Sequence, residues 1–364
     1  MRAFVEVDLK AIAKNISTIK NQTESEILAV VKADAYGHGL IPVAKAAVDA
    51  GAAWLGVALL DEALALRDNG ITVPIISWLT PPSADFQDAV KSNIDLSVPS
   101  ILHLRLVEAA GKKVGMRPRV HIEVDTGMTR GGLLNEWQEF LTIINSAEVD
   151  VIGFWSHFAR ADEPEQVANA EQLKIFTEHL AELRAVGIDP IYVHFANSAA
   201  TLTNSKSHNE IVRVGIAMYG LSPDLKTMGA GESLGLQPAM TLKAELHLVK
   251  AASAGLSVGY GGTATTSANT KLGIVAMGYS DGIPRNTSNL AGVYVAGKRA
   301  PIIGRVSMDQ FVVDLGPDST AKSGDIVTVF GGVGYTIDDW ANAANTINYE
   351  IVTRIASRVP RIYE

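Results

Sequence analysis

Several side chains that could transfer protons or bind anions follow short apolar runs in the first 220 residues. Lys32 follows LAVV, Arg130 lies seven residues after HIE, and His157 follows FWS. A lysine after a fully apolar run is partly desolvated, which disfavours the ammonium form and lowers the pKa. A neutral amine can attack a carbonyl or accept a proton. Taken alone, each of these residues also has a purely structural explanation.

The same arrangement continues later in the chain. Asn197 and Ser198 follow YVHFA, and Arg213 lies in an apolar run that leads to Gly215 and Gly220. Exposed N–H groups around Gly215 would suit a phosphate dianion. We therefore expect a polar site in which these residues meet.

The elements that must position these residues repeat one theme between about residues 26 and 220, a β-branched run followed by a helical pattern. The strand-like runs are EILAVV, AAWLGVA, VPIISW, NIDLSV, RVHIEV, VDVIGFWS, IYVHF and VRVGIAM. About eight such repeats are typical of a (β/α)₈ barrel of the TIM type, which we place at residues 7–233. In such a barrel, functional groups project from the carboxyl ends of the strands, where the polar residues above fall. A doubly wound open sheet is the alternative, but it normally has fewer strands and often a glycine-rich first turn, which the sequence lacks.

The rhythm changes after about Pro238. Residues 234–364 contain strand-like runs and glycine-rich turns without long helices between them, until a helical run near the end. This pattern predicts a C-terminal, mostly-β domain. Residues 1–6 are available to add a strand to it.

Composition excludes several classes of protein. The chain has 364 residues, a net charge of −8 and no cysteine. Disulfides and cysteine-ligated metals are therefore excluded, and no metal site is expected. No basic stretch is dense enough to predict nucleic-acid binding, and no apolar run is long enough to span a bilayer or act as a signal peptide. We expect a cytoplasmic enzyme.

One family shares these motifs in order. The segments VVKADAYGHG, DTGMTRGG, WSHFARADEP, HFANSAAT, RVGIAMYG, SVGYGGT, GYSDGIPR, GRVSMDQ and INYE resemble those of the alanine racemases. The resemblance spans nearly the whole chain. It implies a racemase dependent on pyridoxal 5'-phosphate, acting as a homodimer whose active sites are shared across the interface.

The resemblance assigns the catalytic roles. Lys32 would bind the cofactor covalently and act as one base, and Tyr260 from the partner subunit would act as the other. Two bases on opposite faces can remove the Cα proton and return it to the other side. Both residues have unperturbed pKa values of about 10, so each must be lowered to act near neutral pH. For the tyrosine, a hydrogen bond from His157, with Arg213 behind it, is our hypothesis.

The resemblance also implies the binding residues. Arg213 would face the pyridine nitrogen, and His157 would pack against the ring. Arg130 would hold the phenolic oxygen of the cofactor and the substrate carboxylate, and Met308 would offer its backbone amide to that carboxylate. The remaining expected contacts, mainly to the phosphate, are Tyr36, Asn197, Ser198, Gly215, Ile216 and Tyr349.

One position departs from the family pattern. Many members have a lysine, which can be carbamylated, where this chain has Glu123. We expect the carboxylate of Glu123 to pair directly with Arg130 and replace the charge of the carbamate. Asp309 and Tyr279 also match the family, and we expect them to support the site from behind.

The implied function is interconversion of L-alanine and D-alanine, which would supply D-alanine for peptidoglycan. The alternative is a broad-specificity or serine racemase of the same fold, because pocket size is not readable from the sequence. Decarboxylation of a basic amino acid would not need Tyr260 as a base. A barrel that only binds pyridoxal phosphate would not need the second domain.

Overall fold

The computed structural model describes residues 1–364, which form two units. The barrel unit comprises residues 12–35 and 40–237, and the β unit comprises residues 1–11, 36–39 and 238–364. The short segment 36–39 thus belongs to the β unit although its neighbours in the chain belong to the barrel unit.

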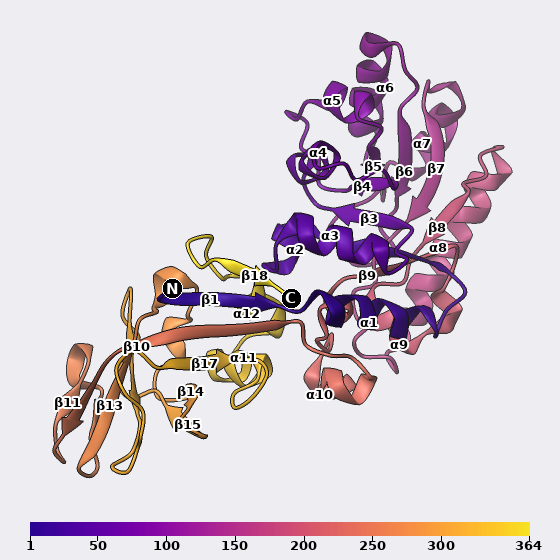
Figure 1. Ribbon diagram of the computed structural model, residues 1–364. Coiled ribbons are helices and arrows are strands. Elements are labelled where there is room, and N and C mark those ends of the chain that lie inside the picture. The colour runs from indigo at the N-terminus through magenta and orange to yellow at the C-terminus, as the bar shows by residue number, and fades with distance from the viewer. The chain divides into compact units, whose positions relative to one another are not determined.

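The barrel unit is built on eight parallel strands in the order β8-β7-β6-β5-β4-β3-β2-β9 (Figure 1). The strands are β2 (Glu26–Val30), β3 (Trp54–Val57), β4 (Ile75–Ser77), β5 (Asp95–Val98), β6 (Arg119–Glu123), β7 (Asp150–Trp155), β8 (Tyr192–His194) and β9 (Ile211–Val214). The two end strands lie beside each other, and the Arg213 N–H donates to the Ala196 carbonyl at 2.9 Å. The sheet is therefore a nearly closed barrel, and the predicted fold class is confirmed.

Helices follow the strands and lie around the barrel (Figure 1). They are α1 (Leu9–Lys20), α3 (Leu40–Asp49), α4 (Leu60–Asp68), α5 (Phe86–Lys91), α6 (Ile101–Val114), α7 (Trp137–Ile143), α8 (Val167–Ala185), α9 (Ser198–Thr203) and α10 (Leu225–Met228). Because helices cover the sheet, every residue of β3, β4 and β5 is buried. Parallel strands buried in this way are normally apolar runs, which is why the sequence signal was clear.

The β unit contains a second eight-stranded sheet. Its main path runs β15-β14-β17-β10-β1-β18, and β13 and β16 extend from β10. The strands are β1 (Ala3–Val7), β10 (Met240–Ala252), β13 (Thr270–Val275), β14 (Gly292–Val295), β15 (Lys298–Pro301), β16 (Phe311–Asp314), β17 (Ile326–Phe330) and β18 (Arg361–Tyr363). The first strand of the chain lies in this sheet, between β10 and β18. A hairpin of β11 (Ser257–Val258) and β12 (Ala264–Thr265) and the helices α11 (Ile337–Ala344) and α12 (Asn348–Thr353) complete the unit.

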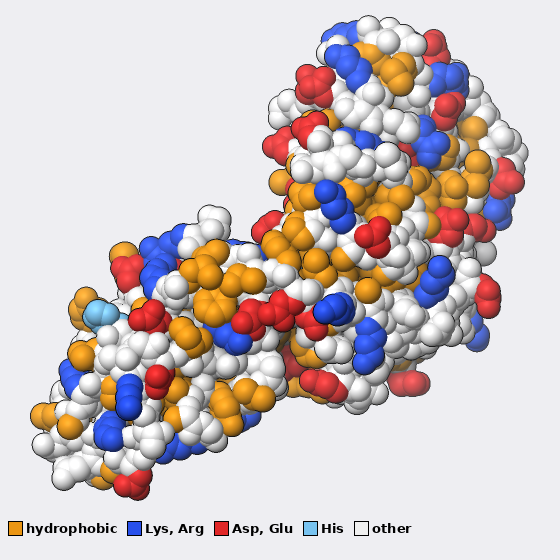
Figure 2. Space-filling model, viewed as in Figure 1, with side chains coloured by type: hydrophobic (Ala, Val, Ile, Leu, Met, Phe, Trp, Pro, Cys, Tyr) orange, Lys and Arg blue, Asp and Glu red, His pale blue; other side chains and the backbone are white.

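The surface carries both signs of charge. Figure 2 shows acidic and basic side chains interspersed on the visible face, without an extended area of basic residues. No helix combines the length and the apolar character needed to cross a membrane.

Candidate active site

The carboxyl ends of the barrel strands carry most of the expected site residues of the barrel unit. Lys32 follows β2, Glu123 ends β6, and His157 follows β7. Ser198 follows β8, and Arg213 lies in β9. Because all eight strands are parallel, these positions share one rim of the barrel, where barrel enzymes place their active sites.

Lys32 lies half-buried at this rim. Burial lowers the pKa of its amine, and the positive charge of Arg130 lowers it further, while the carboxylate of Glu62 opposes both effects. The structure therefore lowers the pKa of this amine in the direction that the sequence predicted.

Arg213 is the most constrained cation of the rim, with 4 % of its surface exposed. Its Nη1 donates to the carbonyl of His194 at 2.8 Å and to Nδ1 of the same histidine at 3.2 Å. Its Nη2 donates to the carbonyls of Ser156 at 2.8 Å and Phe195 at 3.2 Å, and to Nδ1 of His157 at 3.2 Å. Burial lowers the pKa of this guanidinium to about 9, so it remains a cation at neutral pH. None of the five bonds uses the Nε–H group, which leaves one donor for a ligand.

His157 is held in one tautomer by this arginine. Burial and the positive charges of Arg213, Arg130 and Lys32 lower the pKa of His157 well below its usual value, so the ring is neutral. Since Arg213 donates to Nδ1, the single proton of the neutral ring lies on Nε2. His157 can therefore donate one hydrogen bond through Nε2.

Ser198 and Ile216 provide hydrogen-bond donors at the ends of β8 and β9, and Gly215 holds Ser198 in place. The Ser198 hydroxyl accepts from the N–H of Gly215 at 2.8 Å, which leaves its own proton free to be donated. Ile216 begins a 3₁₀ turn, and the first N–H groups of such a turn have no partner within it. Asn197 accepts from the N–H of Ala200 and caps α9. These donors would suit an anion.

Arg130 and Glu123 do not pair as expected. Glu123 instead accepts from the hydroxyl of Ser97 at 3.0 Å, and that hydroxyl accepts from Nε1 of Trp155 at 3.0 Å. Burial raises the pKa of Glu123 to about 7 against the opposing effect of Arg130 and Arg213. Arg130 is exposed and forms no ion pair within 4.0 Å. Its guanidinium is therefore free to bind a ligand carboxylate.

The β unit holds the other expected site residues. Tyr260 begins a 3₁₀ turn after β11 and is 70 % exposed, and Met308 is 54 % exposed. The rings of Tyr36 and Tyr349 lie 6.2 Å apart, and burial raises the pKa of Tyr36. Tyr279 lies in a turn that contacts the Met308 loop, because its N–H donates to the Ser307 carbonyl at 3.0 Å. Asp309 accepts from Arg358.

Comparison with known proteins decides the family. Residues 7–223 match the model for the alanine racemase N-terminal domain, and residues 239–363 match that for the C-terminal domain. The alanine racemase of Salinispora tropica is 48 % identical over 373 residues, covering 100 % of this chain and 98 % of that protein. The chain belongs to the alanine racemase family.

Solved structures agree with this assignment. An alanine racemase from Streptomyces lavendulae is 45 % identical with a TM-score of 0.97, covering 100 % of this chain and 97 % of that one. An alanine racemase from Bartonella henselae, solved with covalently bound pyridoxal phosphate, is 30 % identical with a TM-score of 0.91 and full coverage of both chains. As a member of this family, the chain is an amino-acid racemase.

The sequence did not reveal a row of buried polar residues behind the racemase site. Nδ1 of His194 accepts from Arg213, so Nε2 of His194 donates to Nδ1 of His121 at 2.8 Å. Nε2 of His121 then lies 3.4 Å from Asp95. Burial would raise the pKa of Asp95, but hydrogen bonds from His121 and Arg119 lower it. The available signal was the presence of these polar residues inside otherwise apolar runs.

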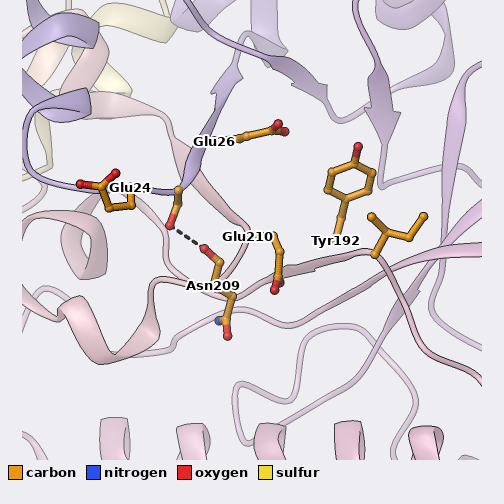
Figure 3. A pocket seen from close by; sticks show the side chains of 7 residues that line it. Glu24, Glu26, Tyr192, Asn209 and Glu210 are labelled. Carbon is orange, nitrogen blue, oxygen red and sulfur yellow. Dashed lines mark hydrogen bonds between the residues drawn. The ribbon is translucent and has the colours of Figure 1, made fainter.

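A cavity of about 340 Å³ lies at the opposite end of the barrel (Figure 3). Glu26 and Tyr192 begin β2 and β8, and Glu210 immediately precedes β9. These are the amino ends of the strands. The cavity is therefore separate from the rim that carries Lys32 and Arg213.

Proposed function

We propose that this chain interconverts L-alanine and D-alanine with pyridoxal 5'-phosphate bound to Lys32. The observation that carries the proposal is the buried Arg213, which fixes His157 and keeps one donor free at the barrel rim that also carries Lys32, whose pKa is lowered by burial. The family assignment and the cofactor named for the Bartonella henselae enzyme support it.

The donors of the barrel rim fit this cofactor. The free Nε–H of Arg213 matches an unprotonated pyridine nitrogen. The Ser198 hydroxyl and the Ile216 N–H match a phosphate, and Gly215 holds that hydroxyl in place. We assign Tyr36, Asn197 and Tyr349 to the same binding site on the family pattern. When bound, the cofactor supplies an electron sink that stabilises negative charge at Cα of the substrate.

Lys32 and Tyr260 then serve as the two bases. Once the substrate amine has taken its place on the cofactor, the half-buried amine of Lys32 would be free to accept the Cα proton on one face and return it there in the reverse direction. Tyr260, exposed in the isolated chain, would reach the opposite face of a site in the partner subunit. This division needs no base to cross the substrate plane.

His157 gives Tyr260 the donor that it needs. Desolvation alone would raise the pKa of a tyrosine, so a hydrogen bond to the phenolate must oppose it. The proton on Nε2 of His157, fixed there by Arg213, is suited to this role. We infer that His157 donates to the partner's Tyr260.

The substrate carboxylate is assigned to Arg130 and to the backbone N–H of Met308. Arg130 has no competing carboxylate within 4.0 Å, because Glu123 is bonded to Ser97. A planar guanidinium can bind a carboxylate through two parallel bonds. Glu123 and Arg130 are not in contact, although the positive charge of Arg130 lowers the pKa of Glu123.

The direct test uses the purified, cofactor-loaded protein with each enantiomer of alanine and serine in D₂O. We expect inversion of chirality together with exchange of the Cα proton for alanine, and much weaker activity for serine. The comparisons do not favour the serine alternative. Lys32→Ala is the control and should abolish both signals. Inactivity of the native protein on alanine would overturn the proposal.

We further propose that the D-alanine supplies peptidoglycan synthesis and that the enzyme works in the cytoplasm. Expression in a bacterium that requires D-alanine should restore growth without it, whereas the Lys32→Ala variant should not. Failure of the active native enzyme to restore growth would argue against this role.

A further inference from the structure

The loop that contains Met308 is attached to a neighbouring turn of the β unit. The N–H of Tyr279 donates to the Ser307 carbonyl at 3.0 Å, and the N–H of Ser280 donates to the Met308 carbonyl at 3.0 Å. The Ser280 hydroxyl donates to the same Met308 carbonyl at 2.7 Å. A Cβ at Gly278 would lie 2.3 Å from both carbonyl oxygens, so only glycine allows this approach.

This attachment decides where the Met308 N–H points. The Ser307 carbonyl and the Met308 N–H belong to one peptide plane, and all peptide bonds of the chain are trans. In a trans peptide, the two groups point in opposite directions. Because the turn holds the carbonyl, the N–H is directed away from the turn. Any movement of the loop relative to the turn would change its direction.

The turn itself is centred on Asp281, whose side chain is fully buried. Its carboxylate accepts from Arg2 at 2.6 and 3.0 Å, from Nε of Arg358 at 2.5 Å, and from the N–H of Gly278 at 3.0 Å. Burial would raise the pKa of Asp281, but these bonds lower it to about 2. The turn is therefore fixed by two arginines on one buried carboxylate.

Only one of the two arginines also reaches the loop. Nη2 of Arg358 donates to the Ser280 hydroxyl at 2.5 Å and to Oδ1 of Asp309 at 2.5 Å. Arg358 thus joins the buried Asp281 of the turn to the exposed Asp309 of the loop. Arg2 donates to Asp281 and to the Ala276 carbonyl, and to neither Ser280 nor Asp309.

We propose that Arg358 is a positioning residue for substrate binding, which holds residues 307–309 so that the Met308 N–H meets the substrate carboxylate. The inference rests on the proposed function, in which Met308 donates to that carboxylate. Arg358 touches neither substrate nor cofactor and acts through Ser280 and Asp309.

The test compares Arg358→Gln with Arg2→Gln in the cofactor-loaded, full-length protein. Both changes remove one cation from Asp281, but only the first releases the loop. We expect Arg358→Gln to raise KM for both enantiomers of alanine by about tenfold, which corresponds to weakening one charge-assisted hydrogen bond, with kcat changed much less. Arg2→Gln should leave KM within about twofold of the native value.

A binding measurement separates this role from a general loss of activity. Propionate carries the carboxylate but has no amine to react, and calorimetry reports its affinity without turnover. We expect Arg358→Gln to weaken propionate binding about tenfold, with the cofactor absorbance spectrum unchanged, and Arg358→Lys to restore part of it. Unchanged propionate affinity, or equal effects of the Arg2 and Arg358 variants, would overturn the inference.

A third variant covers the case in which Arg358→Gln does not fold. Asp309→Asn weakens the bond between Arg358 and residue 309, while both arginines still bind Asp281. Like Arg358→Gln, it should raise KM for alanine. Native KM in this variant would then overturn the inference. A native enzyme that does not racemise alanine would instead overturn the proposed function. The two failures are therefore distinguishable.

Discussion

Most N–H groups of Arg213 donate to other residues of the protein, and this limits what the side chain can offer a ligand. Four of its N–H groups are used by the protein, and these bonds fix both the guanidinium and the tautomer of His157. An arginine offers a hydrogen bond but not a proton at neutral pH. In the proposed complex, a pyridine nitrogen facing Arg213 would therefore stay unprotonated, and the ring would withdraw less charge from the substrate.

We predict that Arg213→Glu increases abortive transamination. A carboxylate at this position would favour a protonated pyridine nitrogen and a longer-lived carbanion, which has more time to be protonated at the wrong carbon. The measurement is the pyruvate formed per D-alanine formed from L-alanine. Arg213→Lys retains a cation and is the control. The same ratio in Arg213→Glu and the native enzyme would contradict this account.

Glu123 should make stability depend on pH. Its pKa of about 7 in the folded protein exceeds the value of about 4.3 expected in the unfolded chain. Between these values the folded state binds more protons, so stability falls as pH rises through this window. The loss approaches about 4 kcal/mol at most.

Glu123→Gln removes this effect while keeping an acceptor for Ser97. Urea unfolding at pH 5 and pH 8 should show a smaller loss of stability in the variant than in the native protein. Glu139→Gln, at an exposed position, is the control and should match the native pH dependence. If the native and Glu123→Gln proteins lost the same stability between pH 5 and pH 8, the loss would not come from Glu123.

Residue types and positions were predictable, but several partners were not. The sequence predicted Lys32 and His157 directly after strands and Arg213 near the start of the last strand. The structure places all three at one rim, with Arg213 near the carboxyl end of β9. It could not predict that Glu123 would bond Ser97 instead of Arg130, because that choice depends on the side chains that neighbouring strands present. A carboxylate pairs with the donor that lies nearest in space. Distances between side chains on different strands cannot be read from the local sequence.

At the scale of elements, regular strands and helices were predictable from their periodicity. The turn after Lys32 was not. Residues 33–36 all have φ between 52° and 53°, which makes one left-handed turn of non-glycine residues. Each costs about 1 to 2 kcal/mol relative to a right-handed turn. The run KADAY contains good helix formers, and such propensities do not distinguish the two hands.

Side chains around this turn offset its cost. Glu62 of α4 accepts from the N–H of Ala33 at 2.6 Å and from the N–H groups of Ala58 and Leu59. Asp34 accepts from the N–H of Leu40 at 2.8 Å. Hydrogen bonds therefore hold both ends of the turn. Because Lys32 immediately precedes the turn, they also fix the backbone next to Lys32.

We predict that Ala33→Gly is tolerated where glycine is usually harmful. Glycine adopts positive φ without strain, which should balance its extra entropy in the unfolded chain. Unfolding free energy should change by less than about 0.5 kcal/mol. The matched control is Ala46→Gly in the right-handed α3, which should lose about 1 kcal/mol. Equal losses in denaturant unfolding would contradict the strain argument.

At the scale of the whole molecule, the two proposed bases belong to different units of the chain. Lys32 lies in the barrel unit, and Tyr260 lies in the β unit. Both residues could be predicted from the sequence, because each lies in a short motif of consecutive residues. Which copy of the chain supplies Tyr260 to a given Lys32 depends on assembly, which local sequence does not encode. We propose that the partner subunit supplies it in a homodimer.

Mixed dimers test this proposal directly. Lys32→Ala and Tyr260→Phe each remove one base and should be inactive as homodimers. If sites are shared, a mixed dimer has one site lacking both bases and one site with native Lys32 and native Tyr260. Equal amounts of the two variants, unfolded together and refolded, should form half mixed dimers and recover about one quarter of native activity. Tandem purification through two different tags should enrich that activity to about one half, with cofactor content as the control. If both bases come from the same chain, every site in the mixture lacks one of them and no activity returns.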